Sequence, residues 1–186
     1  ISLGLVGSEM CIRDRYYQVN TTYYNALGED EQALLLARAL QIFMPGKPQV
    51  WYLDLFAGSN DYEAVKRAGA GGHKEINRTN LSQKDIESGL EKEVVKKQLE
   101  MLKFRKEFPA FGFDAEMEIR TKPAAQISAQ AENALHFAEL PADQMYNRIY
   151  ITWKKDGYLA RLSADLKAHT YRIQALDPSG NLVWQS

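Results

Sequence analysis

The stretch DEQALLLARALQIFMPGKPQVWYLDLF, residues 30–56, decides the fold class. Its first part opens with acidic residues, is rich in strong helix formers and stops at Pro45 and Gly46, which predicts a helix over residues 30–44. Apolar residues cover most of this helix, so we expect it to be buried on more than one side. Residues 49–56, QVWYLDLF, form a nearly continuous apolar run that is typical of a strand in a parallel sheet covered on both faces. A helix followed closely by such a strand indicates an α/β repeat.

The segment after this predicted strand is polar and rich in glycine. Residues 57–81, AGSNDYEAVKRAGAGGHKEINRTNL, carry four of the twelve glycines of the chain. In (β/α)8 barrels the loops at the carboxyl ends of the strands build the active site. We therefore expect site residues in this segment.

Two helical segments follow the polar loop. Ser82 and Asp85 have the spacing of a capping box and predict the start of a short helical turn. A longer amphipathic helix comes next and ends at Pro109. Its predicted apolar stripe consists of Leu90, Val94, Val95, Leu99, Leu102 and Phe108.

The pattern changes to short strands after Phe111. Turn sequences KDG, residues 155–157, and DPSGN, residues 177–181, separate runs with strand character. We expect a small antiparallel β-domain that begins near residue 112. The predicted strands are residues 116–120, 134–138, 148–153, 158–163, 171–176 and 182–184.

Length and composition restrict the function classes. The chain has 186 residues, whereas a complete (β/α)8 barrel takes about 250 residues, so only part of one fits. The net charge of -1 is spread without blocks, which gives no reason to expect nucleic acid or a membrane surface as partner. No apolar run reaches the roughly 18 residues of a membrane span. Cys11 is the only cysteine, which suits a reducing compartment, and we expect a cytoplasmic protein.

Motifs for cofactors and metals are missing from the sequence. There is no GxGxxG or P-loop sequence, and AGAGGHK lacks the lysine followed by serine or threonine that ends a P-loop. His73, His136 and His169 lie far apart, without metal-ligand spacing to acidic residues. We expect neither a cofactor nor a metal. Asp54 interrupts the apolar run, and it is either a site residue or the anchor of the loop that follows.

Several motifs in register resemble successive segments of the sucrose phosphorylase group of the alpha-amylase superfamily, glycoside hydrolase family 13. They cover residues 16–111, just over half of the chain. The motifs are QVNTTYYNALG (18–28), LARALQIFMPGKPQVWYL (36–53), AGSNDYE (57–63), KEINR (74–78) and VVKKQLEMLKFRKEFPAF (94–111).

This resemblance implies a fold and an activity. The fold class is then α/β, with the C-terminal portion of a (β/α)8 barrel over residues 16–111 and a C-terminal β-domain over residues 112–186. The implied activity is the transfer of glucose from an α-glucoside, such as sucrose or glucosylglycerate, to inorganic phosphate by double displacement with retention. The catalytic carboxylates of the family precede the matched region, so the fragment alone is expected to be inactive. The full-length enzyme is expected to be a homodimer.

The resemblance also implies which residues contact substrate. Tyr17 and Gln18 match the end of a mobile loop that reads the acceptor or phosphate. His73, Lys74 and Glu75 take the place of a Gly-Arg-Asp run whose arginine helps to hold glucose; Lys74 keeps the charge but loses the planar fork.

Other features of the same loop shift the expected substrate. The run GGHKE, with Asp54 where a small residue is common, is similar to relatives that act on glucosylglycerate or related glucosides with an anionic acceptor. Asn60 and Asp61 are further candidates for substrate binding.

Residues 1–15, ISLGLVGSEMCIRDR, look like translated adapter sequence and match nothing in the family; the alternative is a genuine terminal strand. Two other functions stay open. One is an α-glucoside hydrolase or transglucosylase on the same barrel, against which the QVN and INR segments argue. The other is a non-catalytic sugar-binding β-domain, which the β-rich C-terminal region supports.

Overall fold

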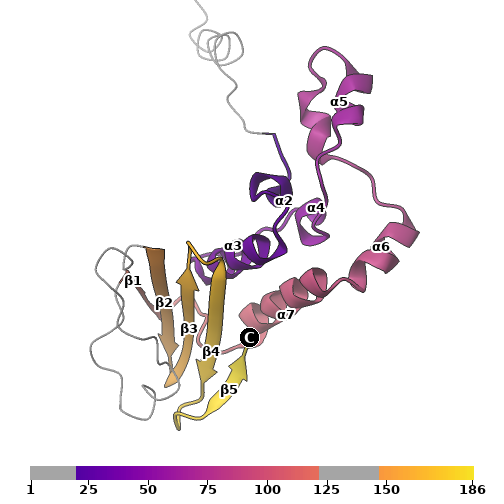
Figure 1. The fold of residues 1–186 in the computed structure, drawn as a ribbon. Coiled ribbons are helices and arrows are strands. Elements are labelled where there is room, and N and C mark those ends of the chain that lie inside the picture. Colours follow the sequence, from indigo (N-terminus) through magenta and orange to yellow (C-terminus); the bar gives the residue numbers. More distant parts are fainter. Residues whose placement is uncertain (1–19, 122–146) are drawn as a thin grey trace, which may run out of the picture.

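The computed structural model describes residues 20–121 and 147–186, in which a helical part precedes an antiparallel sheet (Figure 1). The helices are α2 (Tyr23–Ala26), α3 (Glu31–Phe43), α4 (Tyr52–Leu55), α5 (Tyr62–Ala68), the 3-10 helix η1 (Gly72–Asn77), α6 (Gln83–Leu90) and α7 (Glu93–Glu107). The strands are β1 (Glu116–Arg120), β2 (Arg148–Lys155), β3 (Tyr158–Asp165), β4 (Thr170–Leu176) and β5 (Leu182–Gln185). Residues 1–15, Tyr17, Gln18 and the predicted strand 134–138 lie outside the described residues.

Helix α3 confirms the helix predicted at residues 30–44. Asp30 caps its N-terminus, with a side-chain oxygen that accepts a hydrogen bond from the Gln32 backbone N–H at 2.8 Å. The helix ends before Pro45, which cannot donate to a continuing ladder. Eight of its thirteen residues are buried, so it is covered on more than one side, as expected.

The predicted strand at residues 49–56 is wrong. Residues 49–51 have no regular structure, and Tyr52–Leu55 form the short helix α4. A strand of a parallel sheet must pair with neighbouring strands, and every strand pairing within the described ranges is antiparallel and made elsewhere. The apolar run instead closes bonds within itself, from Leu55 N to Trp51 O at 3.0 Å and from Phe56 N to Tyr52 O at 3.2 Å.

The helix pair α6 and α7 confirms the capping box but changes the predicted apolar stripe. Ser82 and Asp85 cap each other's backbone N–H at the start of α6. Leu90 and Leu99 are 41% and 38% exposed, so their assignment to the buried stripe is wrong. The helical structure is interrupted between α6 and α7, so Leu90 lies on α6. Leu99 lies beside the buried face of α7. That face is formed by Val94, Val95, Gln98, Met101 and Phe104.

The five strands confirm the predicted small antiparallel domain. Neighbours in sequence are neighbours in the sheet, in the order β1-β2-β3-β4-β5. The turn between β2 and β3 contains Asp156 and Gly157 with φ of 49° and 81°, the left-handed pair that a two-residue hairpin needs. Side chains alternate between the two faces, and Ile151, Leu162 and Ile173 are fully buried on one face.

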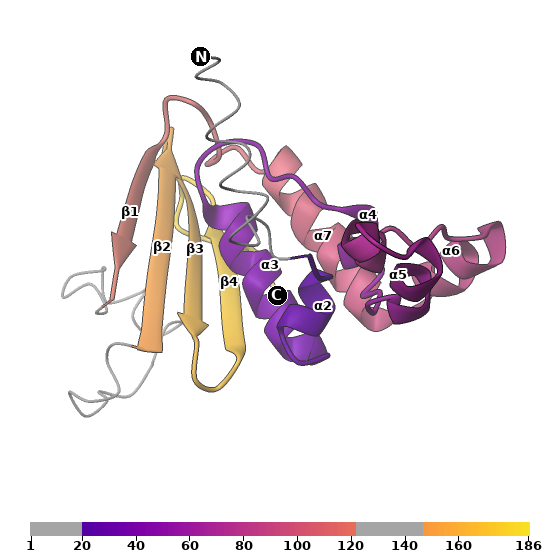
Figure 2. The ribbon, with the colours of Figure 1, turned by 90° about the horizontal axis from the view of Figure 1, so that it is seen from above.

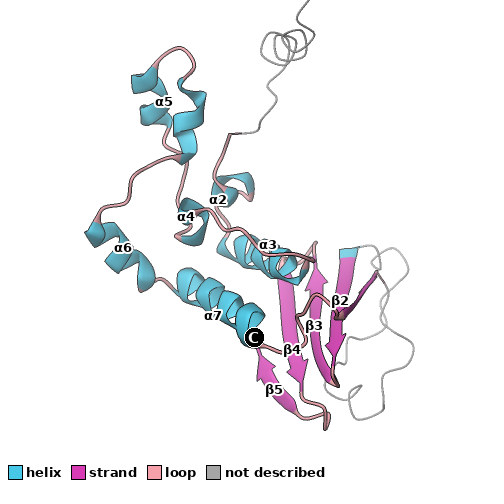
Figure 3. Ribbon diagram, turned by 180° about the vertical axis from the view of Figure 1, so that it is seen from behind, coloured by secondary structure: helices cyan, strands magenta, loops and turns pink. Residues whose placement is uncertain are grey.

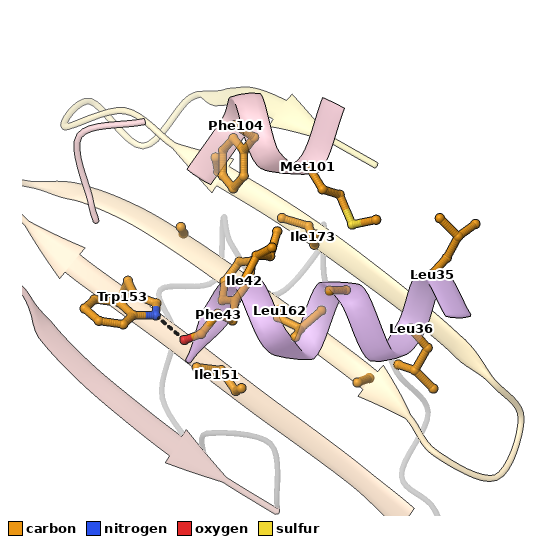
Figure 4. Packing of buried hydrophobic residues seen from close by; sticks show 14 of the residues in the cluster. Leu35, Leu36, Ile42, Phe43, Met101, Phe104, Ile151, Trp153, Leu162 and Ile173 are labelled. Carbon is orange, nitrogen blue, oxygen red and sulfur yellow. Dashed lines mark hydrogen bonds between the residues drawn. The ribbon is translucent and has the colours of Figure 1, made fainter. Parts of the chain in front are cut away.

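One hydrophobic core joins the sheet to the helices. Figure 2 shows the helices on one side of the sheet, and Figure 3 shows the molecule from the side opposite to Figure 1. Helix α3 contacts β3, β4 and α7. Figure 4 shows how Phe43 and Ile42 of α3 lie among Ile151, Trp153 and Leu162 of the sheet. The Trp153 indole N–H donates to the Phe43 carbonyl at 2.8 Å, which fixes the end of α3 on β2.

Candidate functional site

The polar segment after α4, residues 57–81, projects from the rest of the molecule and then returns to it. We call this segment the excursion. Asp61 caps α5 by accepting a hydrogen bond from the Ala64 N–H at 2.8 Å. After α5 and η1 the chain returns to the same point, because the Asp61 N–H donates to the Ile76 carbonyl at 2.8 Å. In Figure 1 this excursion projects away from the sheet, beyond α4.

The glycines of AGAGGHK make the reversal between α5 and η1. Gly69 ends α5 with φ of 66°, and Gly71 precedes η1 with φ of 86°. At Gly72 a Cβ would lie 2.4 Å from the Ala68 Cβ, so only glycine allows this approach. The run therefore serves a tight chain reversal, which agrees with the missing P-loop signature.

His73, Lys74 and Glu75 all lie on η1, directly after this reversal. His73 is exposed, whereas Lys74 and Glu75 are partly buried. The Glu75 carboxylate pairs with the Arg78 guanidinium at 3.4 Å, with both side chains about half exposed. His73 and Lys74 also have interaction partners within the protein. The three residues are adjacent on one short element, as the sequence motif requires.

Asn60 connects the start of the excursion to α2. Its side-chain oxygen accepts a hydrogen bond from the backbone N–H of Thr22 at 2.7 Å, and its own backbone N–H donates to the Asn25 side-chain oxygen at 2.6 Å. Its amide nitrogen also lies 3.1 Å from the Thr21 hydroxyl. Asn60 thus uses its side chain to hold residues 21–25 against the excursion.

Asp54 makes a similar contact with the residue after Thr22. Its carboxylate accepts a hydrogen bond from the Tyr23 backbone N–H at 2.7 Å. The first N–H groups of a helix have no partner within the helix, and Asp54 supplies one at the start of α2. This contact ties α4 to α2, which is neither substrate binding nor a contact with the loop that follows Asp54.

The return arm of the excursion, residues 77–79, is held by Trp51 and Tyr52, which were not among the predicted site residues. The Trp51 indole N–H donates to the Asn77 carbonyl at 2.9 Å, and the Tyr52 hydroxyl donates to the Thr79 carbonyl at 2.8 Å. The Asn77 side chain reaches the Thr21 carbonyl at 3.3 Å. Asn77 lies in the motif KEINR and Thr21 in the motif QVNTTYYNALG, so the family motifs could have indicated both residues.

These contacts bring Asp54, Asn60 and Asp61 next to α2 and to the return arm. The segment that contains Tyr17 and Gln18 leads directly into α2, although both residues lie outside the described part of the chain. His73, Lys74 and Glu75 are reached through the excursion, which returns beside Asp61. The structure therefore joins two segments that are about forty residues apart in sequence into one polar region.

The polar region offers hydrogen-bond donors and acceptors, which are groups for recognition. In residues 20–121 and 147–186 no three His, Cys, Asp or Glu side chains are grouped as a metal site requires. A cavity of about 540 Å³ lies elsewhere, among the residues that follow α3, the end of α7 and Trp153. None of the predicted site residues lines it. The described helices include none that is long and apolar enough to cross a membrane.

Comparisons with known proteins give related enzymes, although no family model matches the chain. A sucrose 6(F)-phosphate phosphorylase from Ilumatobacter coccineus is 51% identical over 81% of this chain and 28% of that protein. A glucosylglycerol phosphorylase from Marinobacter adhaerens is 32% identical over 74% of this chain and 28% of that protein.

A solved structure extends the likeness to the fold. The crystal structure of sucrose 6F-phosphate phosphorylase from Thermoanaerobacter thermosaccharolyticum matches with a TM-score of 0.70 and 38% identity, over 91% of this chain and 29% of that chain. These matches confirm the resemblance on which the expected fold class rests. The chain spans less than a third of the length of these relatives.

Proposed function

We infer that this chain, which belongs to the sucrose phosphorylase group, is the C-terminal part of a longer retaining phosphorylase. That enzyme transfers glucose from an α-glucoside to inorganic phosphate. A carboxylate attacks the anomeric carbon, an acid protonates the leaving sugar, and phosphate then takes the glucosyl group from the enzyme. The observation that carries this proposal is the 51% identity to a phosphorylase over 81% of the chain.

The part described here contributes recognition and support to that enzyme. We assign residues 16–111 to its barrel and residues 112–186 to its β-domain, and the described helices share one hydrophobic core with the described strands. Lys74 and its neighbours on η1 hold the sugar, and Gln18, which can both donate and accept hydrogen bonds, reads the acceptor or phosphate. Asp54, Asn60 and Asp61 give these groups their positions through the contacts with α2 and α5.

The substrate that best fits this chain has an anionic leaving sugar. Two relatives named as sucrose 6(F)-phosphate phosphorylases are 51% and 39% identical to the chain. The run GGHKE, together with Asp54, also resembles relatives that act on glucosides with an anionic acceptor. We therefore propose sucrose 6F-phosphate, or an α-glucoside with a similarly charged acceptor, as substrate.

A substrate panel tests this assignment. The full-length protein that contains this chain is incubated with phosphate and, in turn, sucrose 6F-phosphate, sucrose, glucosylglycerol and glucosylglycerate, and glucose 1-phosphate is measured. We expect the highest kcat/KM for sucrose 6F-phosphate. Preference for an uncharged glucoside would overturn the anionic acceptor, whereas phosphate-independent release of glucose would favour the hydrolase alternative.

A further inference from the structure

Arg38 is a cation in the middle of the hydrophobic core. It lies on α3, and the residue is only 1% exposed. The Nε atom donates to the side-chain oxygen of Gln98 at 2.8 Å, and Nη1 donates to Gln41. The buried Nη2 atom has no hydrogen-bond partner among the described residues. Burial lowers the pKa of Arg38, and the nearby Asp54 charge partly offsets this.

Arg38 is one member of a closed circuit of contacts that runs through four helices. Gln98 on α7 accepts from Arg38 and donates its own amide N–H to the Leu55 carbonyl at 2.9 Å. The residue before Leu55 is Asp54, which holds the Tyr23 backbone N–H at 2.7 Å. The Tyr23 ring closes the circuit, because the Arg38 guanidinium lies 5.7 Å from its centroid.

A buried guanidinium with an unpaired nitrogen is a poor way to stabilise a core. Replacing buried charged groups with apolar side chains of similar volume is often neutral or stabilising. An apolar side chain cannot orient its neighbours through hydrogen bonds, whereas the guanidinium presents its donors in a fixed planar fork. The specific result of Arg38 is therefore the geometry of the groups around it.

The circuit passes through the start of α2 and through the end of α4. Tyr23 begins α2, and Leu55 ends α4, directly before the excursion that carries Lys74. We propose that Arg38 is a positioning residue for the reaction: with Gln98 it fixes the place of α2 relative to the start of the excursion. This proposal rests on the proposed function.

Two variants of the full-length protein test the proposal, with one control. Arg38→Met removes the fork but keeps an unbranched apolar side chain. Gln98→Glu keeps an acceptor for the Arg38 Nε–H and replaces the donor to the Leu55 carbonyl with a carboxylate oxygen, which repels that carbonyl. Ile42→Val is the control, because Ile42 is fully buried on the same helix and outside the circuit.

The readouts are kcat/KM for phosphorolysis, the melting temperature, and amide hydrogen exchange of residues 20–25 and 52–60. We expect Arg38→Met and Gln98→Glu to lower kcat/KM roughly ten- to hundredfold, because small displacements of positioning groups have effects of that size. Exchange in both segments should be faster than in Ile42→Val.

The proposal is overturned if Gln98→Glu matches Ile42→Val in both kcat/KM and exchange, even where Arg38→Met fails to fold. If the unmodified full-length protein has no phosphorylase activity, the proposed function fails by itself. The exchange comparison then still decides whether Arg38 and Gln98 hold the two segments.

Discussion

At the scale of single residues, Lys74 gives the sharpest test of the sugar-binding assignment. We expect Lys74→Ala in the full-length enzyme to lower kcat/KM by about ten- to a hundredfold, because losing a charged hydrogen bond costs roughly 1.5 to 3 kcal/mol. Steady-state kinetics and thermal unfolding measure the two effects separately. Lys66→Ala is a suitable control, since the Lys66 side chain is 71% exposed and pairs with Glu63 on α5. Unchanged kinetics with a sharply lower melting temperature would make Lys74 a structural anchor instead.

The sequence identifies candidate site residues better than it identifies their partners. Asp54 stands out as a carboxylate within an apolar run, and Asn60 lies in a matched motif. Their hydrogen-bond partners, Tyr23 and Thr22, lie 31 and 38 residues earlier in the chain. No local pattern encodes such a pairing, because it depends on how α2 and α4 pack in three dimensions.

At the scale of elements, the contact between Asp30 and His169 predicts a pH dependence of the free energy of unfolding. This exposed contact links the start of α3 to the turn between β3 and β4. The Asp30 carboxylate caps α3 and contacts His169 Nδ1 at 2.9 Å. The hydrogen bond with His169, followed by those from the backbone of Gln32 and Ala33, lowers the pKa of Asp30 below 3.8. Its contribution to the free energy of unfolding is therefore fully present above about pH 4 and is lost as the pH falls through the lowered pKa.

Asp30→Asn isolates this contribution from that of other carboxylates. The free energy of unfolding of the full-length protein, measured between pH 2 and pH 7, should decline less steeply below about pH 4 in the variant than in the unmodified protein. Two parallel curves would show that Asp30 does not titrate as the contact predicts.

Helix α7 allows a second test at this scale, because its buried face differs from the predicted one. Met101 is 1% exposed and Leu99 is 38% exposed. Met101→Ala in the full-length protein should lower the free energy of unfolding by about 2 to 5 kcal/mol, the cost of truncating a buried side chain. Leu99→Ala should cost clearly less. Denaturant unfolding compares the two, and equal losses would contradict the observed orientation of the helix.

Elements with local signals were predictable, and those that depend on distant partners were not. The cap at Asp30, the capping box at Ser82 and the turn at Asp156 and Gly157 are all set by neighbours in sequence. The apolar run at residues 49–56 has the composition of a buried strand, yet it forms α4. A parallel strand exists only with its neighbours, so composition alone could not decide between the two.

At the scale of the whole molecule, one core explains why the helices and the sheet hold together. The contact from Trp153 to Phe43 spans 110 residues, and Phe104 of α7 stacks on Trp184 of β5 with ring centroids 4.2 Å apart. The family, and the change from helices to strands near residue 112, could be inferred from motifs and turn sequences along the chain. This long-range packing could not, because alternation in a strand tells which residues share a face but not what covers that face.

The central claim is that the chain is one part of a retaining phosphorylase and lacks the groups that break the glycosidic bond. The most direct measurement compares the purified 186-residue chain with the full-length protein, with sucrose 6F-phosphate and inorganic phosphate as substrates. We expect α-glucose 1-phosphate from the full-length protein and none from the chain alone, because positioning residues cannot replace a nucleophile. Glucose 1-phosphate from the isolated chain, or none from the full-length protein with any α-glucoside, would contradict the account.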